Sequence, residues 1–161
     1  MEKNLSDLFV DALRDIFYAE KQILRALPKM AREAGSPELK DAFETHRDQT
    51  ETHVERLQQV FEQIDKPARG KTCEAINGII DEAREVIDDF KGAEALDAGL
   101  VASAQAVEHY EIARYGALKA WARRLGLDEA AELLDRTLQE EIKTDQLLTD
   151  LAMHEANRKA A

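Results

Sequence analysis

The sequence is poor in the residues that build cross-linked or membrane-bound proteins. Its single cysteine, Cys73, has no second thiol for an internal disulfide, and a thiolate metal site needs several cysteines at set spacings. Apolar runs extend over only a few residues, and no apolar stretch flanked by basic residues stands at the amino terminus. We therefore expect a soluble, cytoplasmic protein with no membrane partner.

Glycine and proline are also scarce, with 7 and 3 residues among 161. Apolar residues make up 44% of the chain and charged residues 34%, which is typical of a folded protein and not of a disordered or low-complexity chain. The length is sufficient for one domain with its own core. We therefore expect a single domain over residues 1–161.

Positive charge is in deficit. The chain has 22 Lys and Arg residues against 33 Asp and Glu residues, for a formal net charge of −11. An acidic surface repels phosphate backbones, and the one basic cluster, Arg123 and Arg124, lies beside a predicted helix end where cations are favoured. We expect no nucleic-acid partner.

Apolar residues recur with the three-and-four spacing of helix faces, and no segment alternates with period two. Gly35 ends the first pattern, and Ser36 and Pro37 supply a cap and a first-turn proline for the next. Pro28 removes one backbone hydrogen bond inside the first helix, so we expect a kink there or a break. The predicted helices cover residues 5–34, 37–65, 73–91, 94–125 and 128–156.

This pattern predicts an all-α fold, a four-helix bundle of two antiparallel hairpins. The hairpins cover residues 5–64 and 95–156 and turn at Gly35 and Gly126. The connection of about thirty residues between them is long enough to cross the bundle and contains the short fifth helix. The similar layout suggests an internal repeat, but too few residues are identical to establish one.

Polar side chains interrupt the apolar stripe of every long predicted helix. They are Glu20 in the first helix, His46, Gln49, Thr50 and His53 in the second, Glu108 and Glu111 in the next long helix, and Glu141 and Asp145 in the last. Antiparallel helices meet at equal distances from their loop. Glu20 and Thr50 each lie 15 residues from the first glycine turn, and Glu111 and Glu141 lie 15 residues from the second. The interruptions of each hairpin therefore fall at one level, and we expect the two levels to coincide.

Carboxylates gathered at one level of a bundle core need compensation, because burying an unpaired carboxylate costs several kcal/mol. Taken singly, each glutamate would be interpreted as a stripe-edge residue that reaches water. Protons could neutralise the group by raising pKa values, and a pair of metal ions held by oxygen ligands and an imidazole could do the same. The metal ligands that we expect are Glu20, His53, Glu108, Glu111, Glu141 and Asp145.

The other histidines and the tyrosines receive different interpretations. His46 lies two turns nearer the loop than His53 and is assigned a supporting or structural role, and His109 points off the stripe. Tyr18 and Tyr110 could hydrogen-bond a ligand, whereas Tyr115 is assigned to the core or its rim.

Four stretches resemble the YciE/YciF-like branch of the ferritin-like superfamily. They are LRDIFYAEKQILRALPKMA (13–31), HRDQTETHVERLQQVFE (46–62), AVEHYEIARYGALKAWA (106–122) and EEIKTDQLLTDLA (140–152). The resemblance covers nearly the whole chain. It implies a four-helix bundle with a long crossover, a rubrerythrin-like di-iron centre and a homodimer. It also implies carboxylate ligands at Glu20, Glu108, Glu111 and Glu141 and an imidazole ligand at His53.

Two positions depart from the pattern of such centres. Thr50 stands where a glutamate three residues before His53 would be expected, and Asp145 stands at the second histidine position of the last helix.

The leading hypothesis is a di-iron or mixed iron/manganese protein, bridged by Glu141 or Glu111, whose metals react with peroxide or dioxygen during stress. No organic cofactor is expected. The alternative is a non-catalytic structural or interaction bundle, induced by stress, whose metal site is degraded, and the two departures favour it. A storage cage is a third hypothesis.

Overall fold

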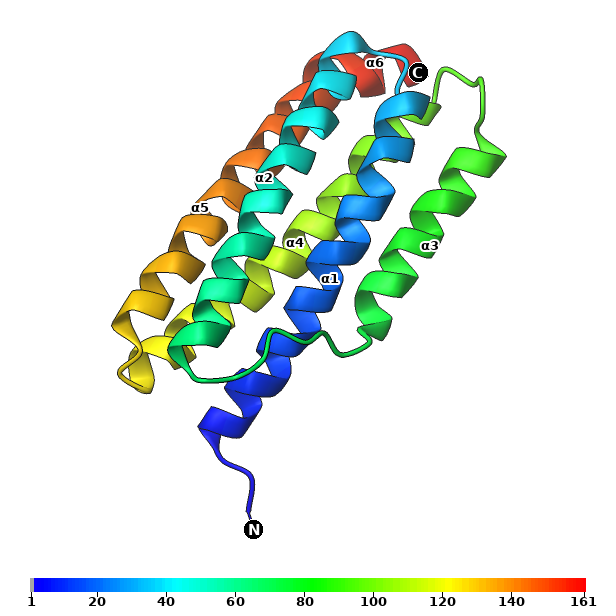
Figure 1. The fold of residues 1–161 in the computed structure, drawn as a ribbon. Helices are drawn as coiled ribbons and strands as arrows, with labels where there is room; N and C mark the ends of the chain where they lie inside the picture. The colour runs from blue at the N-terminus through cyan, green and yellow to red at the C-terminus, as the bar shows by residue number, and fades with distance from the viewer. Residues whose placement is uncertain (1) are drawn as a thin grey trace.

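Every regular element of the described chain, residues 2–161, is helical in the computed structural model (Figure 1). In chain order the elements are α1 (Leu5–Glu33), α2 (Pro37–Gln63), α3 (Glu74–Asp89), α4 (Leu96–Arg124), α5 (Asp128–Leu151), η1 (Ala152–Ala156) and α6 (Asn157–Ala160). The predicted all-α class is confirmed. The expected last helix, 128–156, differs from the structure, because a π-helical turn occupies Ala152–Ala156 and a short helix follows it.

Local sequence explains where the first hairpin begins and turns. Asn4 and Asp7 form a capping box at the start of α1. The Ser36 hydroxyl accepts a hydrogen bond from the Leu39 amide at 3.3 Å, which is the predicted cap of α2. Helix α1 runs unbroken through Pro28, so the alternative of a helix break there is wrong. Proline removes a single backbone donor, and the buried face of α1 on either side holds the helix together.

Helices α1, α2, α4 and α5 form the bundle, and the two hairpins turn at opposite ends of it (Figure 1). The backbone amides of Gly35 and Ser36, in the first turn, donate to the carboxylate of Asp97 in the first turn of α4, at 2.7 and 2.8 Å. The second turn, at Gly126, has a positive φ of 73° that favours glycine. The start of α4 is therefore fastened to the turn of the other hairpin.

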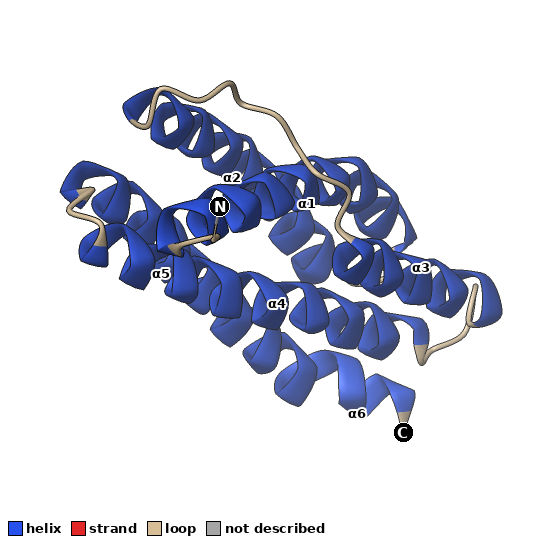
Figure 2. Ribbon diagram, turned by 90° about the horizontal axis from the view of Figure 1, so that it is seen from below, coloured by secondary structure: helices blue, strands red, loops and turns tan. Residues whose placement is uncertain are grey.

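Helix α3 is the crossover helix and lies outside the bundle, along α1 and α4 (Figures 1 and 2). It buries Ile76, Ile80 and Ile87 against the common core. Gly99 allows α4 to approach it closely, because a Cβ at that position would lie 2.6 Å from Cγ1 of Val86. None of the helices in residues 2–161 is long and apolar enough to cross a membrane.

Candidate metal centre

Six acidic and imidazole side chains from all four bundle helices are buried together near the middle of the bundle. They are Glu20 from α1, His46 and His53 from α2, Glu108 and Glu111 from α4, and Glu141 from α5. The four glutamates are at most 1% exposed. Burial of so many ionisable groups in one place is rare, because each loses the hydration of its charged form.

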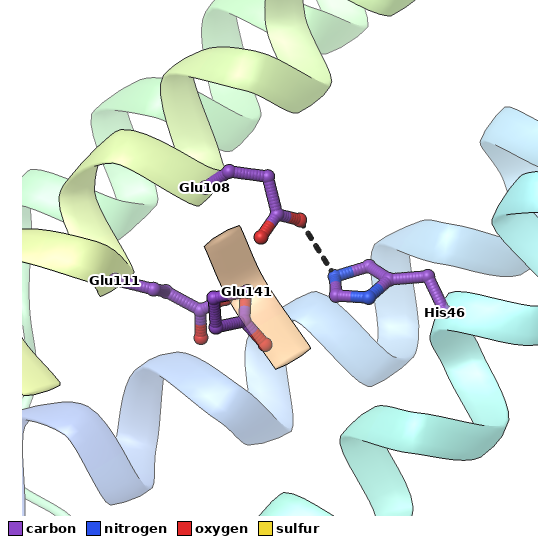
Figure 3. Close-up of side chains that lie close together, drawn as sticks. All are labelled: His46, Glu108, Glu111 and Glu141. Carbon is purple, nitrogen blue, oxygen red and sulfur yellow. Dashed lines mark ion pairs between the residues drawn. The ribbon is translucent and has the colours of Figure 1, made fainter. Parts of the chain in front are cut away.

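The six side chains form two groups that share one residue. His46, Glu108, Glu111 and Glu141 each offer a ligand atom within 4.8 Å of those of the other three (Figure 3). Glu20, His53 and Glu141 do the same. Glu141 can therefore contribute to two metal positions, as a bridging carboxylate does in helical-bundle dimetal centres.

The closest contacts in the centre join imidazoles to carboxylates. Nδ1 of His53 lies 2.9 Å from Oε1 of Glu141 and 3.5 Å from Oε1 of Glu20. Nε2 of His46 lies 2.8 Å from Oε1 of Glu108 (Figure 3). Each imidazole thus turns a nitrogen toward the carboxylates of its own group.

Most of these atoms lack a properly aligned hydrogen bond. Nine buried side-chain atoms of the described chain have no hydrogen-bond partner, and all nine belong to these six residues. His46 Nε2 is one of them, although it is close to Glu108, because proximity without alignment makes no hydrogen bond. Unsatisfied buried donors and acceptors are costly. Their convergence fits a group of ligands that surround a cation.

Burial and mutual repulsion shift the pKa values of the acids. Burial raises the pKa of Glu108 and of Glu111 well above the usual value, and the neighbouring Glu141 adds to both shifts. Burial would also raise the pKa of Glu141, but the close approach of Glu108 and His53 outweighs this effect and holds that pKa below its usual value. Burial therefore favours the protonated forms of Glu108 and Glu111 in the absence of metal.

His53 carries the positive charge of the metal-free centre. Burial by itself lowers the pKa of His53, but the close carboxylates of Glu141 and Glu20 raise it to about 10. Metal ligation requires the deprotonated forms of carboxyl and imidazole groups, so metal binding here would release protons.

A charged pair outside the centre orients His53. Nε2 of His53 lies 2.8 Å from Oε2 of Glu140, and Arg56 holds the two oxygens of Glu140 from Nη1 and Nη2 at 2.7 and 2.9 Å. We assign the Nε2 proton to this contact, because Glu140 is ionised and accepts hydrogen bonds. Nδ1 is then directed at Glu20 and Glu141.

A tyrosine holds Glu20 from the other side. The buried Tyr115 hydroxyl donates to Oε1 of Glu20 at 2.6 Å. The sequence assigned Tyr115 to the core or its rim, and the structure adds this polar contact. In the sequence, Tyr115 lies four residues after Glu111, and this spacing puts both on one face of α4. That spacing could have indicated that Tyr115 lies near the acidic residues.

The structure brings five of the six predicted ligands together and leaves Asp145 outside both groups. Asp145 lies one turn beyond Glu141 on α5 and is partly exposed. Its Oδ1 accepts a hydrogen bond from Gln105, and its Oδ2 lies 3.1 Å from Nε2 of the exposed His109. Thr50 is also satisfied elsewhere, since its hydroxyl donates to the backbone carbonyl of His46 at 2.7 Å.

His46 belongs to the larger group, although the sequence assigned it a supporting or structural role. The two hairpins turn at opposite ends of the bundle. Moving along α2 toward Gly35 is therefore the same direction as moving along α4 away from Gly126. His46 therefore meets Glu108. The signal in the sequence is the seven-residue spacing of His46 and His53, two turns along one helix face, and their ring centroids lie 6.4 Å apart.

Comparison with known proteins agrees with this architecture. Residues 4–161 match the family described as Domain of unknown function (DUF892). The chain is 45% identical over 159 residues to Protein YciF of Escherichia coli strain K12. The aligned region covers 98% of this chain and 96% of that protein.

Solved structures resemble it over nearly the full length. The crystal structure of the E. coli stress protein YciF matches with a TM-score of 0.93 and 44% identity, over 98% of this chain and 99% of that one. YcfI from Rhodopseudomonas palustris, named as a candidate structural protein, matches with a TM-score of 0.89 and 44% identity, over 91% and 94% of the two chains. The chain therefore belongs to the DUF892 family and is a relative of YciF in sequence and in fold.

Proposed function

We propose that this protein is a carboxylate-bridged dimetal protein, with iron or manganese, that reacts with peroxide or dioxygen during stress. The observation that carries the proposal is the set of nine unpartnered ligand atoms buried in two groups that share Glu141. The similarity to an E. coli stress protein supports the link to stress.

The ligand sets follow from the two groups. Glu20, His53 and Glu141 would hold one ion, and His46, Glu108, Glu111 and Glu141 would hold the other. A pair of divalent ions supplies two electrons, which together with two protons reduce a peroxide ROOH to ROH and water.

The surrounding residues prepare the site. Arg56 and Glu140 keep Nδ1 of His53 directed inward, and Tyr115 fixes one oxygen of Glu20. The complete burial of the glutamates keeps bulk water away from the centre.

Metal content per chain tests the proposal. Protein expressed with added iron and manganese and purified without chelator should contain close to two ions per chain by inductively coupled plasma mass spectrometry. Glu141→Gln, which removes the shared ligand, should lose most of both ions. Asp145→Asn is the control and should keep both. Metal near zero in the wild-type protein would contradict the proposal.

A structural role is the second candidate. One similar solved protein is named as a candidate structural protein, and Glu108 and Glu111 can be neutralised by protons because burial raises their pKa values. Without metal, a chelator would leave the melting temperature unchanged, whereas a bound metal stabilises the folded state by mass action.

We propose a homodimer as the assembly state, on the basis of the family resemblance. Size-exclusion chromatography with light scattering should give twice the 18.1 kDa chain mass. A cage would elute far earlier and would instead favour storage.

A further inference from the structure

An apolar cavity of about 90 Å³ lies between α1, α3 and α4, beside the candidate metal centre. Aliphatic side chains from the three helices line it, among them Ile23, Ile80 and Val107. The crossover helix α3 forms its outer wall. The cavity therefore exists because the long connection between the hairpins passes along this side of the bundle.

Two candidate metal ligands, His46 and Glu108, also line the cavity. They are 5% and 1% exposed, and neither Nδ1 of His46 nor Oε2 of Glu108 has a hydrogen-bond partner. The lining of the apolar space thus includes two buried residues that carry unpartnered polar atoms. A molecule with an apolar part and one small polar group would match a lining that is mostly aliphatic with two polar residues.

The outer edge of the cavity carries three cationic side chains, Arg25, Lys29 and Arg84. Lys29 lies 3.7 Å from Asp88, and Arg84 lies 2.9 Å from Asp81, both carboxylates belonging to α3. Two of the three cations are thus already paired with carboxylates, so this edge of the cavity is not arranged to bind an anion. The lining favours a neutral ligand.

We propose that this cavity binds the alkyl group of a small organic hydroperoxide and places its O–O group beside His46 and Glu108. The inference rests on the proposed function and names its substrate class. The volume suits about four carbons, since a cavity of roughly 150 Å³ holds benzene. Each buried CH₂ adds roughly fourfold to affinity, so a tert-butyl group gains on the order of a hundredfold over hydrogen peroxide.

The reaction balances without a further component in a single turnover. Cleavage of the O–O bond of ROOH to ROH and water takes two electrons and two protons; a divalent metal pair held by the two groups would supply the electrons, and solvent would supply the protons. The alcohol ROH remains as the product that must leave the cavity.

Binding is tested first on the metal-free protein, with tert-butanol as the unreactive probe. The methyl resonances of Ile80 and Val107 should shift on titration in the wild-type protein. Ala104→Leu fills the cavity from α4 and should weaken binding at least tenfold, whereas Ala106→Leu, on the exposed side of α4, should not. Ala83→Leu fills it from α3 and replaces Ala104→Leu if circular dichroism shows that variant unfolded. Absence of shifts in the wild-type protein, or equal binding by the filled variant, would overturn the cavity assignment.

Reactivity is tested on metal-loaded protein in single turnovers with tert-butyl hydroperoxide and with hydrogen peroxide. The filled variant should react at least tenfold more slowly with the alkyl hydroperoxide and within twofold of the wild-type rate with hydrogen peroxide. An equal loss with both peroxides would overturn the substrate class. If neither peroxide reacts while tert-butanol still binds, the proposed function fails and the substrate assignment fails with it.

Discussion

At the scale of single residues, the centre depends on side chains that are never ligands themselves. Glu140 accepts the Nε2 proton of His53 and is in turn held by two nitrogens of Arg56. Such partners fix the orientation of a ligating imidazole and raise its basicity. The sequence pattern did not single out Glu140, which lies off the apolar stripe of its helix.

Glu140→Gln should weaken metal binding by about 10- to 100-fold, because the amide holds the imidazole less firmly than a carboxylate does. Competition with a chromophoric chelator measures the affinity. Glu132→Gln, on the exposed face of the same helix, is the matched control and should bind as the wild-type protein does. Unchanged affinity in Glu140→Gln would remove its positioning role.

His46→Gln should lower the metal content from about two ions to about one, because His46 belongs to only one of the two groups. His109→Gln serves as the control, since its side chain is 68% exposed and pairs with Asp145. Metal analysis of the purified variants measures the effect. Retention of both ions in His46→Gln would return His46 to the supporting role that the sequence suggested.

At the scale of elements, the crossover helix depends on one glycine. A Cβ at Gly99 would lie 2.6 Å from Cγ1 of Val86, far inside van der Waals contact, so α3 and α4 can pack closely only if that Cβ is absent. The same helix forms the outer wall of the apolar cavity and buries three isoleucines in the core. Close packing of α3 therefore links fold stability to the environment of the centre.

Gly99→Ala should destabilise the protein by about 1–3 kcal/mol, because overpacking outweighs the gain in helix propensity. Val86→Ala in the same chain should restore much of the loss. Gly78→Ala is the control within α3, where an added Cβ meets nothing within 4 Å, and it should stabilise by up to about 1 kcal/mol. Urea unfolding followed by circular dichroism measures the free energy of unfolding of all three variants. A Gly99→Ala variant more stable than the wild-type protein would show that α3 can move away from the added Cβ without loss of stability.

At the scale of the whole molecule, the centre ties stability to protons and metal. The pKa of His53 is raised from 6.5 to about 10, and burial raises the pKa values of Glu108 and Glu111 well above 4.5. Between pH 5.5 and 8.5 the folded metal-free protein therefore binds more protons than the unfolded chain. Glu140 and Glu141, whose pKa values are lowered, are ionised in both states over this range and add no slope.

The metal-free protein should lose stability as pH rises from 5.5 to 8.5, with a fall in melting temperature of about 5–10 °C. The contribution of His53 is complete below pH 6.5 and disappears as pH rises toward 10. Differential scanning calorimetry measures the trend, and the double variant Glu108→Gln/Glu111→Gln should reduce its slope but keep the part that His53 contributes. A melting temperature that rises over this interval would contradict the assigned protonation states.

Metal should reverse this trend, because binding displaces the protons that stabilise the metal-free form and is therefore favoured at higher pH. The rise in melting temperature on metal addition should be larger at pH 8 than at pH 6. A scan with and without excess chelator at each pH gives the comparison, and an equal shift at both values would argue against ligation by Glu108, Glu111 and His53.

Much of this protein was determined by local sequence pattern. Helical periodicity predicted the four long helices and the shorter crossover helix, and the cap at Ser36 predicted the first turn. Polar residues on apolar stripes predicted five of the clustered side chains, Glu20, His53, Glu108, Glu111 and Glu141. These features are local, since each depends on residues within a few turns of one helix.

The tertiary structure decided what depends on how helices sit against one another. The crossover with α3 carries the chain back along the bundle, so the two hairpins turn at opposite ends, and this arrangement brings His46 to Glu108. Asp97 fastens the first turn to the start of α4. The packing also pairs Asp145 with Gln105 and His109 and creates the apolar cavity beside α3. The axial register and rotation of packed helices are set by contacts between distant segments, which no periodicity within one helix encodes.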